Sequence, residues 1–571
     1  KISYYDTIMI VILQVFYSFF SAFITSAAIP SEFLTFGSPF LGLFALVPLY
    51  LAISKSSSFK MAGFICSLQM GTVHLLTSFW LGNFKDFALF TLGASAAVYY
   101  IWGFFWGQLL YISFAYTKKF QLDLQSGKKQ WIIPLRILSF AAVWTVYEWF
   151  KSIGFLAYPW GTILMSAYKW KLVSQICSIT GVWGLSFLFA LFSAVFAEGS
   201  LLLRLNPKQR YKSYACTAAF CMVLFSISTV YGVFQYTKNR IPEKTINAVF
   251  VQQNADSWTV DTKINLKNAI NLSQSGLEKA IEINMDVDTF IWSESSLPHP
   301  LPESYNYYTR TPSDLSLIDF IAETNIPFII GCPQTLDYKK KQYCNAVHLF
   351  SNKGIVVNWY GKVHLVPFAE GIPYADKKWM QALMQKFVGF SNTWSPGPSY
   401  TVFELPLQDG QTVNFTAPIC FEDAISSICR KLWKEGSEVF INLTNDSWSL
   451  TKSAEYQHFV VASYRAIEMR TTLARSTNSG YSVVVDPAGR VLNSMPLFTA
   501  TAKPMQIPIY ERNYTVYCFL GDWLPILLLA LWTITIFWLA YKQKNTLTQA
   551  KDNVTLQKKT KGNNNSKVDV L

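Results

Sequence analysis

The sequence predicts an α-helical membrane domain of eight spans joined to a single α/β domain. Hydrophobic residues make up 51% of the 571 residues and charged residues only 15%, whereas about a quarter of a soluble domain is charged. Long apolar stretches fill the first part of the chain, and short β-rich runs alternate with helical patterns after residue 238. This composition excludes a disordered or fibrous chain and argues against a wholly soluble protein.

The net charge of +13 is better explained by a membrane than by nucleic acid. In a soluble protein such a charge would suggest nucleic acid as a partner. Here the lysines and arginines cluster between the apolar stretches, as the positive-inside rule predicts for cytoplasmic loops. We therefore expect a membrane protein that binds no nucleic acid.

Eight stretches have the length of a membrane span, because a bilayer core of about 30 Å requires about 20 helical residues. Seven are free of charge: 7–29, 34–53, 61–84, 87–116, 172–197, 213–237 and 523–541. The eighth, at 132–155, is weaker because it carries Arg136, Glu148 and Lys151. The basic loops fall on one side of the membrane only if this stretch also crosses. Eight spans then place both termini in the cytoplasm and residues 238–521 outside it.

We therefore divide the chain into four parts, which are listed from the N-terminus. These are a membrane domain of seven helices (1–237), an external α/β domain (238–521), an eighth transmembrane helix (522–541) and a basic cytoplasmic tail (542–571). In the external domain, strand-like runs alternate with helical patterns, as in an α/β fold. The tail is rich in lysine and asparagine, so we expect it to be disordered.

Reactive side chains follow three of the predicted strands. The candidates are Glu294, Lys362, Glu370, Cys420 and Glu422. Sites in α/β sheets form where strands end, so these side chains can meet. A thiolate attacks a carbonyl, a carboxylate moves the thiol proton, and an ammonium with a backbone N–H stabilises the oxyanion. Taken singly, each residue would more often be structural or solvated, and only the combination favours covalent catalysis.

Four sequence blocks resemble the nitrilase superfamily, whose members use a Glu–Lys–Cys triad. They are WSESSLP (292–298), YGKVHLVPFAEGIP (360–373), ICFEDA (419–424) and NLTNDSW (442–448). Further blocks are YPWG (158–161), QHFVVASYRAIEMR (457–470), ARSTNSGYS (474–482) and GDW (521–523). With the predicted spans, nearly the whole chain resembles the apolipoprotein N-acyltransferase family of the bacterial inner membrane. This resemblance implies an α-β-β-α sandwich on the periplasmic side.

The resemblance also implies roles for individual residues. Cys420 matches the nucleophile, Glu294 the general base and acid, and Lys362 the group that stabilises the oxyanion. Four further positions match residues that support the triad or bind substrate in the family. Glu370 and Glu422 match supporting acids, Asn345 matches an asparagine near the site, and Trp258 matches an aromatic residue in substrate handling. Two positions depart from the family pattern: Phe421 replaces a usual tyrosine but keeps the backbone N–H of the oxyanion site, and Ala369 replaces a usual glycine.

The reaction implied by the resemblance is an acyl transfer between two lipids. Cys420 attacks an ester of a phospholipid such as phosphatidylethanolamine and forms a thioester. The α-amine of an S-diacylglyceryl-cysteine, at the N-terminus of an apolipoprotein, then takes the acyl chain. No metal and no diffusible cofactor is implied. We expect a monomer, because eight spans would cover the faces through which soluble nitrilases associate.

The segment after Glu370 is unusually apolar for a loop. Its large side chains are Trp379, Met380, Leu383, Met384, Phe387, Val388, Phe390 and Trp394. We interpret it as a lid, or as an arm that dips into the membrane and guides acyl chains. A small satellite core beneath the loop is the alternative.

Several alternatives stay open. The chain could be a membrane-tethered carbon–nitrogen hydrolase, or a non-catalytic membrane protein with a degenerate domain. Cys332 and Cys344 could form a disulfide or remain free thiols. We expect His458 to bond locally rather than to bind a metal, and Trp160 to anchor the chain at the membrane interface.

Overall fold

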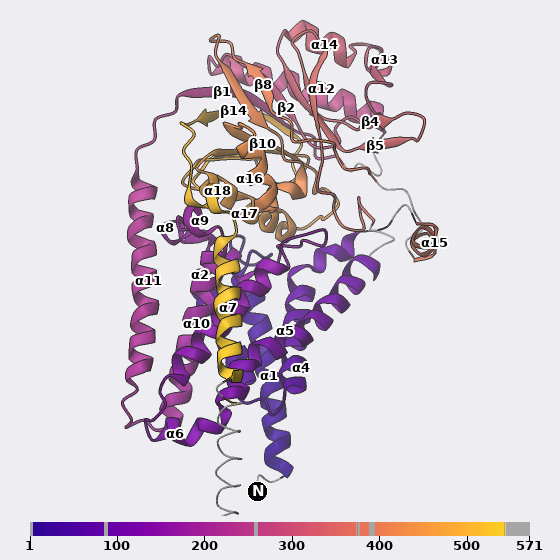
Figure 1. The fold of residues 1–571 in the computed structure, drawn as a ribbon. Helices are drawn as coiled ribbons and strands as arrows, with labels where there is room; N and C mark the ends of the chain where they lie inside the picture. Colours follow the sequence, from indigo (N-terminus) through magenta and orange to yellow (C-terminus); the bar gives the residue numbers. More distant parts are fainter. Residues whose placement is uncertain are drawn as a thin grey trace, which may run out of the picture.

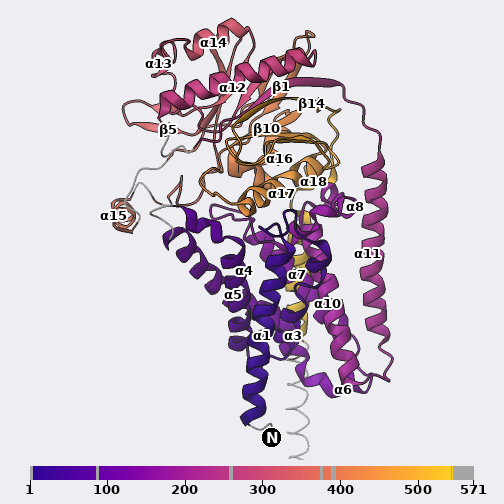
Figure 2. The same cartoon turned by 180° about the vertical axis from the view of Figure 1, so that it is seen from behind.

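The structure is a computed structural model that describes residues 4–84, 89–255, 261–372, 374, 377–387, 394–541 and 543. Helices of the first 237 residues form a bundle, and an α/β domain lies against one end of it (Figure 1). The longer bundle helices are α1 (Tyr4–Ala28), α4 (Phe59–Thr77), α5 (Ser95–Thr117), α7 (Ile132–Phe150), α10 (Trp183–Leu205) and α11 (Lys212–Thr237). Figure 2 shows α11 standing at the edge of the bundle.

Five of the described helices are long and apolar enough to cross a membrane. They are Tyr5–Ala28, Ile132–Phe150, Trp183–Leu205, Lys212–Thr237 and Trp523–Tyr541. The weak stretch at 132–155 is therefore among the candidates, and its charged residues are buried inside the protein. The predicted total of eight spans is not confirmed by this count.

The three other predicted spans differ from the five in shape or polarity. The stretch 34–53 is split into two short helices, α2 (Pro39–Phe44) and α3 (Val47–Ser54), each with a proline in its first turn. Helices α4 and α5 are long but carry polar side chains such as Gln69 and Gln108, and pack against each other. Gly103 of α5 permits this close packing, because a Cβ there would lie 2.7 Å from a carbonyl oxygen of α4.

One predicted boundary is wrong. The stretch 172–197 begins with two single-turn helices, α8 (Lys171–Ser174) and α9 (Cys177–Thr180), and the long helix α10 starts only at Trp183. Gly181 separates them with a φ of +63°, a conformation that ends a helix and that few side chains tolerate. Apolar composition hides this turn, since both halves are equally hydrophobic.

The α/β domain contains two six-stranded sheets. The first has the order β14-β1-β2-β3-β6-β7, built from Thr501–Ile509, Lys244–Gln252, Thr289–Trp292, Phe328–Gly331, Ala346–Phe350 and Val356–Gly361. The second has the order β13-β12-β11-β10-β9-β8, built from Val491–Ser494, Val483–Val485, Thr472–Thr477, Val439–Thr444, Thr412–Thr416 and Phe403–Pro406. A separate hairpin pairs β4 (Gln334–Asp337) with β5 (Gln342–Cys344).

The sheets pack face to face between two layers of helices. β11 contacts β1, β2 and β14 across the sandwich. Helices α12 (Thr262–Glu282) and α14 (Leu317–Thr324) cover the first sheet, whereas α16 (Ser426–Lys434) and α17 (Lys452–Met469) cover the second (Figure 1). The inner strands β2, β3, β10 and β11 are buried throughout and run parallel to a neighbour, which explains their continuous apolar character.

Helix α17 joins the α/β domain to the helix bundle. All its residues except Lys452 and Tyr456 are buried, because the sheet covers one side and the bundle the other. Gln457 donates from Nε2 to the carbonyl oxygens of Pro30 at 2.9 Å and Thr77 at 3.0 Å, and the Tyr464 hydroxyl donates to the Leu164 carbonyl at 2.9 Å. These bonds fix the domain against three separate segments of the bundle.

Asp522 fixes the start of the last long helix. Its carboxylate accepts the indole N–H of Trp183 at 2.8 Å and that of Trp149 at 3.1 Å, and the Tyr517 hydroxyl at 3.1 Å. One side chain thereby ties Trp523–Tyr541 to α7, α10 and the short helix α18 (Val516–Leu520). All nine cysteines lie in the described part of the chain and are free, so Cys332 and Cys344 form no disulfide.

We predict that Asp522→Ala lowers the free energy of unfolding by about 2–4 kcal/mol, because two indole N–H groups and one hydroxyl lose their acceptor. Thermal unfolding of the detergent-solubilised protein, followed by tryptophan fluorescence, measures the change. Asp286→Ala, at an exposed position of the loop before β2, is the matched control and should leave the melting temperature nearly unchanged. Equal melting temperatures for the two variants would contradict the anchoring role of Asp522.

Candidate active site

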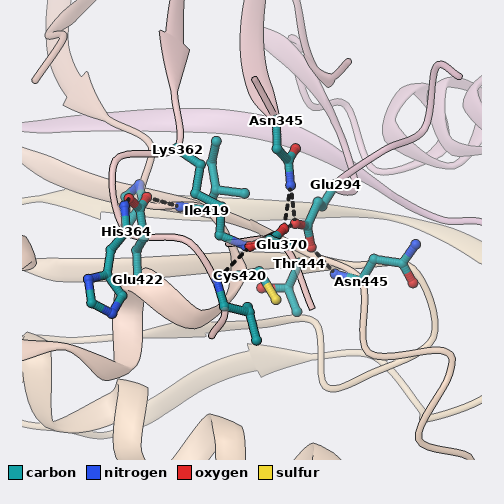
Figure 3. A network of polar contacts seen from close by, with 12 residues as sticks. Glu294, Asn345, Lys362, His364, Glu370, Ile419, Cys420, Glu422, Thr444 and Asn445 are labelled. Atoms are coloured by element: carbon teal, nitrogen blue, oxygen red, sulfur yellow. Dashed lines mark hydrogen bonds and ion pairs between the residues drawn. The ribbon is translucent and has the colours of Figure 1, made fainter. Parts of the chain in front are cut away.

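Four loops that follow strands bring the candidate side chains together. Glu294 follows β2, Lys362 follows β7, and Cys420 follows β9 and opens a short 3-10 turn, η6 (Cys420–Ala424). Asn345 lies between β5 and β6. Figure 3 shows Glu294, Asn345, Lys362 and Glu370 pointing toward one another beside Cys420.

A shared ammonium group is the centre of this cluster. The Lys362 Nζ lies 2.7 and 2.9 Å from the two carboxylate oxygens of Glu370 and 3.6 Å from the Glu294 Oε1. Asn345 donates from Nδ2 to Glu294 at 2.7 Å and to Glu370 at 3.2 Å, so it bridges the two carboxylates. The backbone N–H of Asn445 donates to the other oxygen of Glu294 at 2.8 Å. The site therefore holds two carboxylates and one cation in fixed positions.

Burial sets the proton affinities of this cluster. It raises the pKa of Glu294, and the Lys362 ammonium opposes that rise. Burial alone would lower the pKa of Lys362, but Glu370 and Glu294 outweigh it and raise that pKa. Lys362 therefore stays charged, while Glu294 has the raised proton affinity that a general base and acid needs.

Close packing fixes the backbone of Glu294. Gly331, at the end of β3, lies against it so closely that a Cβ would come 2.6 Å from the Glu294 Cα. The neighbouring strand therefore admits only glycine there, and the carboxylate is held by backbone contacts as well as by its hydrogen bonds.

Cys420 occupies a strained backbone position. Its φ is +48°, in the left-handed region that residues other than glycine rarely adopt. Burial, together with Glu294, raises the pKa of the thiol well above its ordinary value, so the sulfur is protonated at rest. A nucleophile of this kind needs a base to remove its proton. The Sγ lies 4.0 Å from the Asp446 Oδ1.

Glu422 supports the site through backbone hydrogen bonds. Its carboxylate accepts the N–H groups of Val363 at 2.8 Å, Ile419 at 2.9 Å and His364 at 3.0 Å. The Tyr360 hydroxyl also donates to it at 3.1 Å. Burial raises the pKa of Glu422 to about 7 against the effect of these donors. Glu422 thus ties the Lys362 loop to the residue before Cys420, as Figure 3 shows, and does not contact the thiol.

Phe421 stacks against two aromatic rings. Trp160 of the helix bundle lies nearly parallel to it with ring centroids 5.2 Å apart, and His364 also lies nearly parallel to it at 5.7 Å. Trp160 is therefore buried against the catalytic loop, 5% exposed, and the sequence interpretation of this residue as a lipid-interface anchor is wrong. A tyrosine at 421 would place its hydroxyl at the edge of this stack.

The structure also shows polar residues near the thiol that the sequence analysis left without a role. Asp446, Asp423, His458 and Arg475 form a buried chain of ion pairs that ends at Cys420. Asp446 stands two residues after the end of β10, which was the signal used for the triad, whereas Asp423 stands seven residues after the end of β9. The expectation that His458 bonds locally is wrong, because its partners Asp446 and Asp423 are 12 and 35 residues away along the chain and lie outside its helix.

Cys420, Asp446 and His458 have ligand atoms within 4.8 Å of one another, the spacing of a metal site. Both imidazole nitrogens already face carboxylate oxygens, at 2.7 Å to Asp446 and 3.0 Å to Asp423. A metal would have to displace one of these bonds as well as the thiol proton. The arrangement therefore fits a hydrogen-bonded pair better than a metal centre.

Some predicted site residues lie outside the described residues. Trp258 is one of them, and so is the tail from 542 onward apart from residue 543. In the apolar segment, α15 (Lys378–Phe387) lies beside the α/β domain near its junction with the bundle (Figures 1 and 2). Trp379 is 59% exposed and Met384 is buried, so the described residues show neither a fully exposed arm nor a closed satellite core.

Comparisons with known proteins agree with both halves of this architecture. The family model for the apolipoprotein N-acyltransferase N-terminal domain matches residues 13–195, and the carbon-nitrogen hydrolase model matches residues 248–507. Saccharomyces cerevisiae Nit3, a solved member of branch 10 of the nitrilase superfamily, is 18% identical and covers 50% of this chain and 96% of its own, with a TM-score of 0.33.

Two relatives are similar over almost the whole chain, and both are named Apolipoprotein N-acyltransferase 2. The protein from Treponema denticola is 43% identical over 535 residues, which cover 92% of this chain and 98% of that relative. The protein from Treponema pallidum is 40% identical and covers 89% of this chain and 91% of its own. The chain belongs to the apolipoprotein N-acyltransferase family.

Proposed function

We propose that this chain transfers an acyl chain from a phospholipid to the α-amine of S-diacylglyceryl-cysteine in apolipoproteins, through a thioester on Cys420. The observation that carries the proposal is the cluster of buried Glu294 and Lys362 beside the partly exposed Cys420 after strand ends, in a domain seated on apolar helices. Family membership over nearly the full length supports it. Both substrates are lipids held in a bilayer, where such a domain would meet them.

In the first step, Cys420 attacks the ester carbonyl of a phospholipid. Glu294 takes the thiol proton as the carbon–sulfur bond forms. The Lys362 ammonium and the Phe421 N–H stabilise the oxyanion. The ester carbon–oxygen bond then breaks, and Glu294 returns the proton to the leaving oxygen. The products are a thioester on the enzyme and a lysophospholipid, with phosphatidylethanolamine as the favoured donor.

In the second step, the neutral α-amine of the apolipoprotein cysteine attacks the thioester. Its nitrogen forms the amide bond, the carbon–sulfur bond breaks, and Glu294 carries the amine proton to the departing sulfur. Glu370 keeps Lys362 in place throughout, because it shares the ammonium at 2.7 Å. Asn345 orients both carboxylates, and Trp258 contributes to substrate handling. Neither step needs a metal or another cofactor.

The proposed position in the cell follows from charge. Residues 1–237 form seven transmembrane helices, 238–521 the periplasmic catalytic domain, 522–541 the eighth helix and 542–571 a cytoplasmic tail. This arrangement in the bacterial inner membrane places the basic loops in the cytoplasm. Helix α15 acts as a lid that guides acyl chains, supported by the exposed Trp379 at the junction with the bundle. The enzyme acts as a monomer.

We predict that a phospholipid labelled on its acyl chain leaves the label on Cys420 as a thioester. Adding a diacylated lipopeptide moves the label to the peptide amine. Cys420→Ala should abolish both signals, and Cys332→Ala, another buried cysteine of the same domain, should retain them. Intact mass and gel analysis follow the label. Release of the label only into water would indicate a carbon–nitrogen hydrolase-like activity, and absence of any adduct with any lipid would refute the proposal.

We predict that Lys362→Met destabilises the fold by about 3–5 kcal/mol, because two buried carboxylates lose their cation. It should also lower thioester formation by at least about 1,000-fold, since the oxyanion loses its charged partner. The double variant Lys362→Met/Glu370→Gln removes one carboxylate charge as well. It should recover melting temperature without recovering activity. Recovery of both would mean that Lys362 has only a structural role.

A further inference from the structure

A closed circuit of buried polar groups surrounds Cys420 and has no part in the acyl transfer described above. Its members are Cys420, Asp423, Asn442, Asp446, His458 and Arg475. They come from η6, β10, α17, β11 and the loop after β10. Apart from Cys420 itself, each member is at most 7% exposed.

One half of the circuit holds the backbone of Cys420. Asn442 donates from Nδ2 to the Cys420 carbonyl at 3.3 Å and to the Pro418 carbonyl at 2.9 Å. The Asn442 amide oxygen accepts from Arg475 at 3.4 Å, and Arg475 forms an ion pair with Asp423 at 3.0 Å. These contacts hold the backbone of Cys420 at a φ of +48°, because a strained conformation persists only where the surrounding structure fixes it.

The other half reaches the sulfur of Cys420. His458 lies between two carboxylates, with Nε2 3.0 Å from Asp423 and Nδ1 2.7 Å from Asp446. Ionised carboxylates only accept hydrogen bonds, so both ring nitrogens must donate and the ring is an imidazolium. The second oxygen of Asp446 faces the Cys420 Sγ at 4.0 Å. Asp446 thus offers the thiol a hydrogen-bond acceptor that is separate from Glu294.

We propose that Asp446 is a second carboxylate, besides Glu294, that acts directly on the Cys420 thiol. His458, Asp423 and Arg475 position Asp446 and keep it ionised. Asp446 accepts the thiol hydrogen in the resting enzyme and holds the sulfur in one orientation until Glu294 removes the proton. This inference rests on the proposed role of Cys420 as the nucleophile. Asp446 would act on the reacting atom, whereas the other three act through Asp446.

The charges around His458 support this assignment. Asp446 faces it from the loop after β10, Asp423 from η6, Arg475 from β11 and Glu455 from its own helix α17. Burial alone would lower the pKa of His458, but Asp446 and Asp423 raise it to about 9 against the Arg475 charge. Burial alone would raise the pKa of Asp446, but His458 outweighs it and lowers that pKa. Asp423 and Asp446 each carry a negative charge, and His458 and Arg475 each carry a positive charge, so the circuit has no net charge.

Opposite shifts in thiol titration test the proposal. Asp446→Asn removes a negative charge beside the sulfur, so the midpoint for alkylation of Cys420 should move down by about one pH unit or more. His458→Gln removes the compensating positive charge, which persists only up to about pH 9, so alkylation of Cys420 at a fixed pH of about 8 should become slower, the opposite of the change in Asp446→Asn. Iodoacetamide labelling across a pH series, read on the Cys420 peptide by mass spectrometry, measures both. His348→Gln, a buried histidine of β6, is the matched control and should shift nothing.

Thioester formation should fall about 100-fold in both variants, because the sulfur loses its fixed orientation. Below about pH 9 the double variant Asp446→Asn/His458→Gln carries the same net charge as the parent, so its alkylation rate at about pH 8 should return toward that of the parent. If one single variant does not fold, the double variant can still be compared with the other single variant. Stability gives a further readout: His458 has a raised pKa, so its stabilisation is present below pH 6.5 and is lost as the pH rises toward about 9. That loss should disappear in His458→Gln.

Shifts of the same sign in both single variants, or no shift in either, would overturn the inference. Failure of the proposed function looks different, since the parent enzyme would then form no thioester with phospholipid while alkylation still reported the charges around Cys420.

Discussion

The catalytic half of this protein depends on one buried ammonium group. Lys362 lies within 3.6 Å of Glu294 and within 2.9 Å of Glu370, and two ionised carboxylates could not be buried so close together without it. The requirement reaches into the fold, because Glu294 lies in a different loop from Lys362 and Glu370. The strands β2 and β7 must therefore end at the same place, and Glu422 fixes the Lys362 loop to the loop of Cys420.

A second constraint is the packing of the helix bundle against the loops that surround Cys420. Nearly all residues of helix α17 are buried, and Trp160 stacks on Phe421, the residue that follows Cys420. The loop after β10 is also held from the bundle, since Asn83 donates to the Ser449 carbonyl at 2.6 Å and Trp80 packs on Trp448 at 5.6 Å. That loop supplies both the Asn445 N–H to Glu294 and the Asp446 carboxylate. Motions of the bundle and the geometry of the site are thus mechanically connected.

The sequence predicted the parts of this structure that local patterns encode. Apolar length located the long helices, and strand ends located Glu294, Lys362 and Cys420. It failed where the determinant was a turn or a distant partner. Apolar residues on both sides of Gly181 hid the late start of α10 at Trp183. Charge-poor composition alone could not reveal that 34–53 forms two short helices.

The role of Trp160 was mistaken for a related reason. Its stacking partner Phe421 lies in the other half of the chain, so no local pattern links them. The circuit of Asp423, His458 and Arg475 likewise joins three elements that only the fold brings together. A reactive residue that follows a strand can be identified from the sequence, whereas the partners that it meets from other elements require coordinates.

The burial of α17 has a consequence for handling the protein. A fragment comprising the α/β domain alone would leave uncovered the side of this helix that contacts the bundle, including Tyr464 and the Gln457 amide that donates to two bundle carbonyls. Water would replace the amide bonds, but the aromatic and aliphatic surface would have nothing to cover it. Such a fragment would self-associate rather than behave as a free hydrolase. The reaction centre and its membrane seat therefore form a single cooperative unit that cannot be divided at the domain boundary.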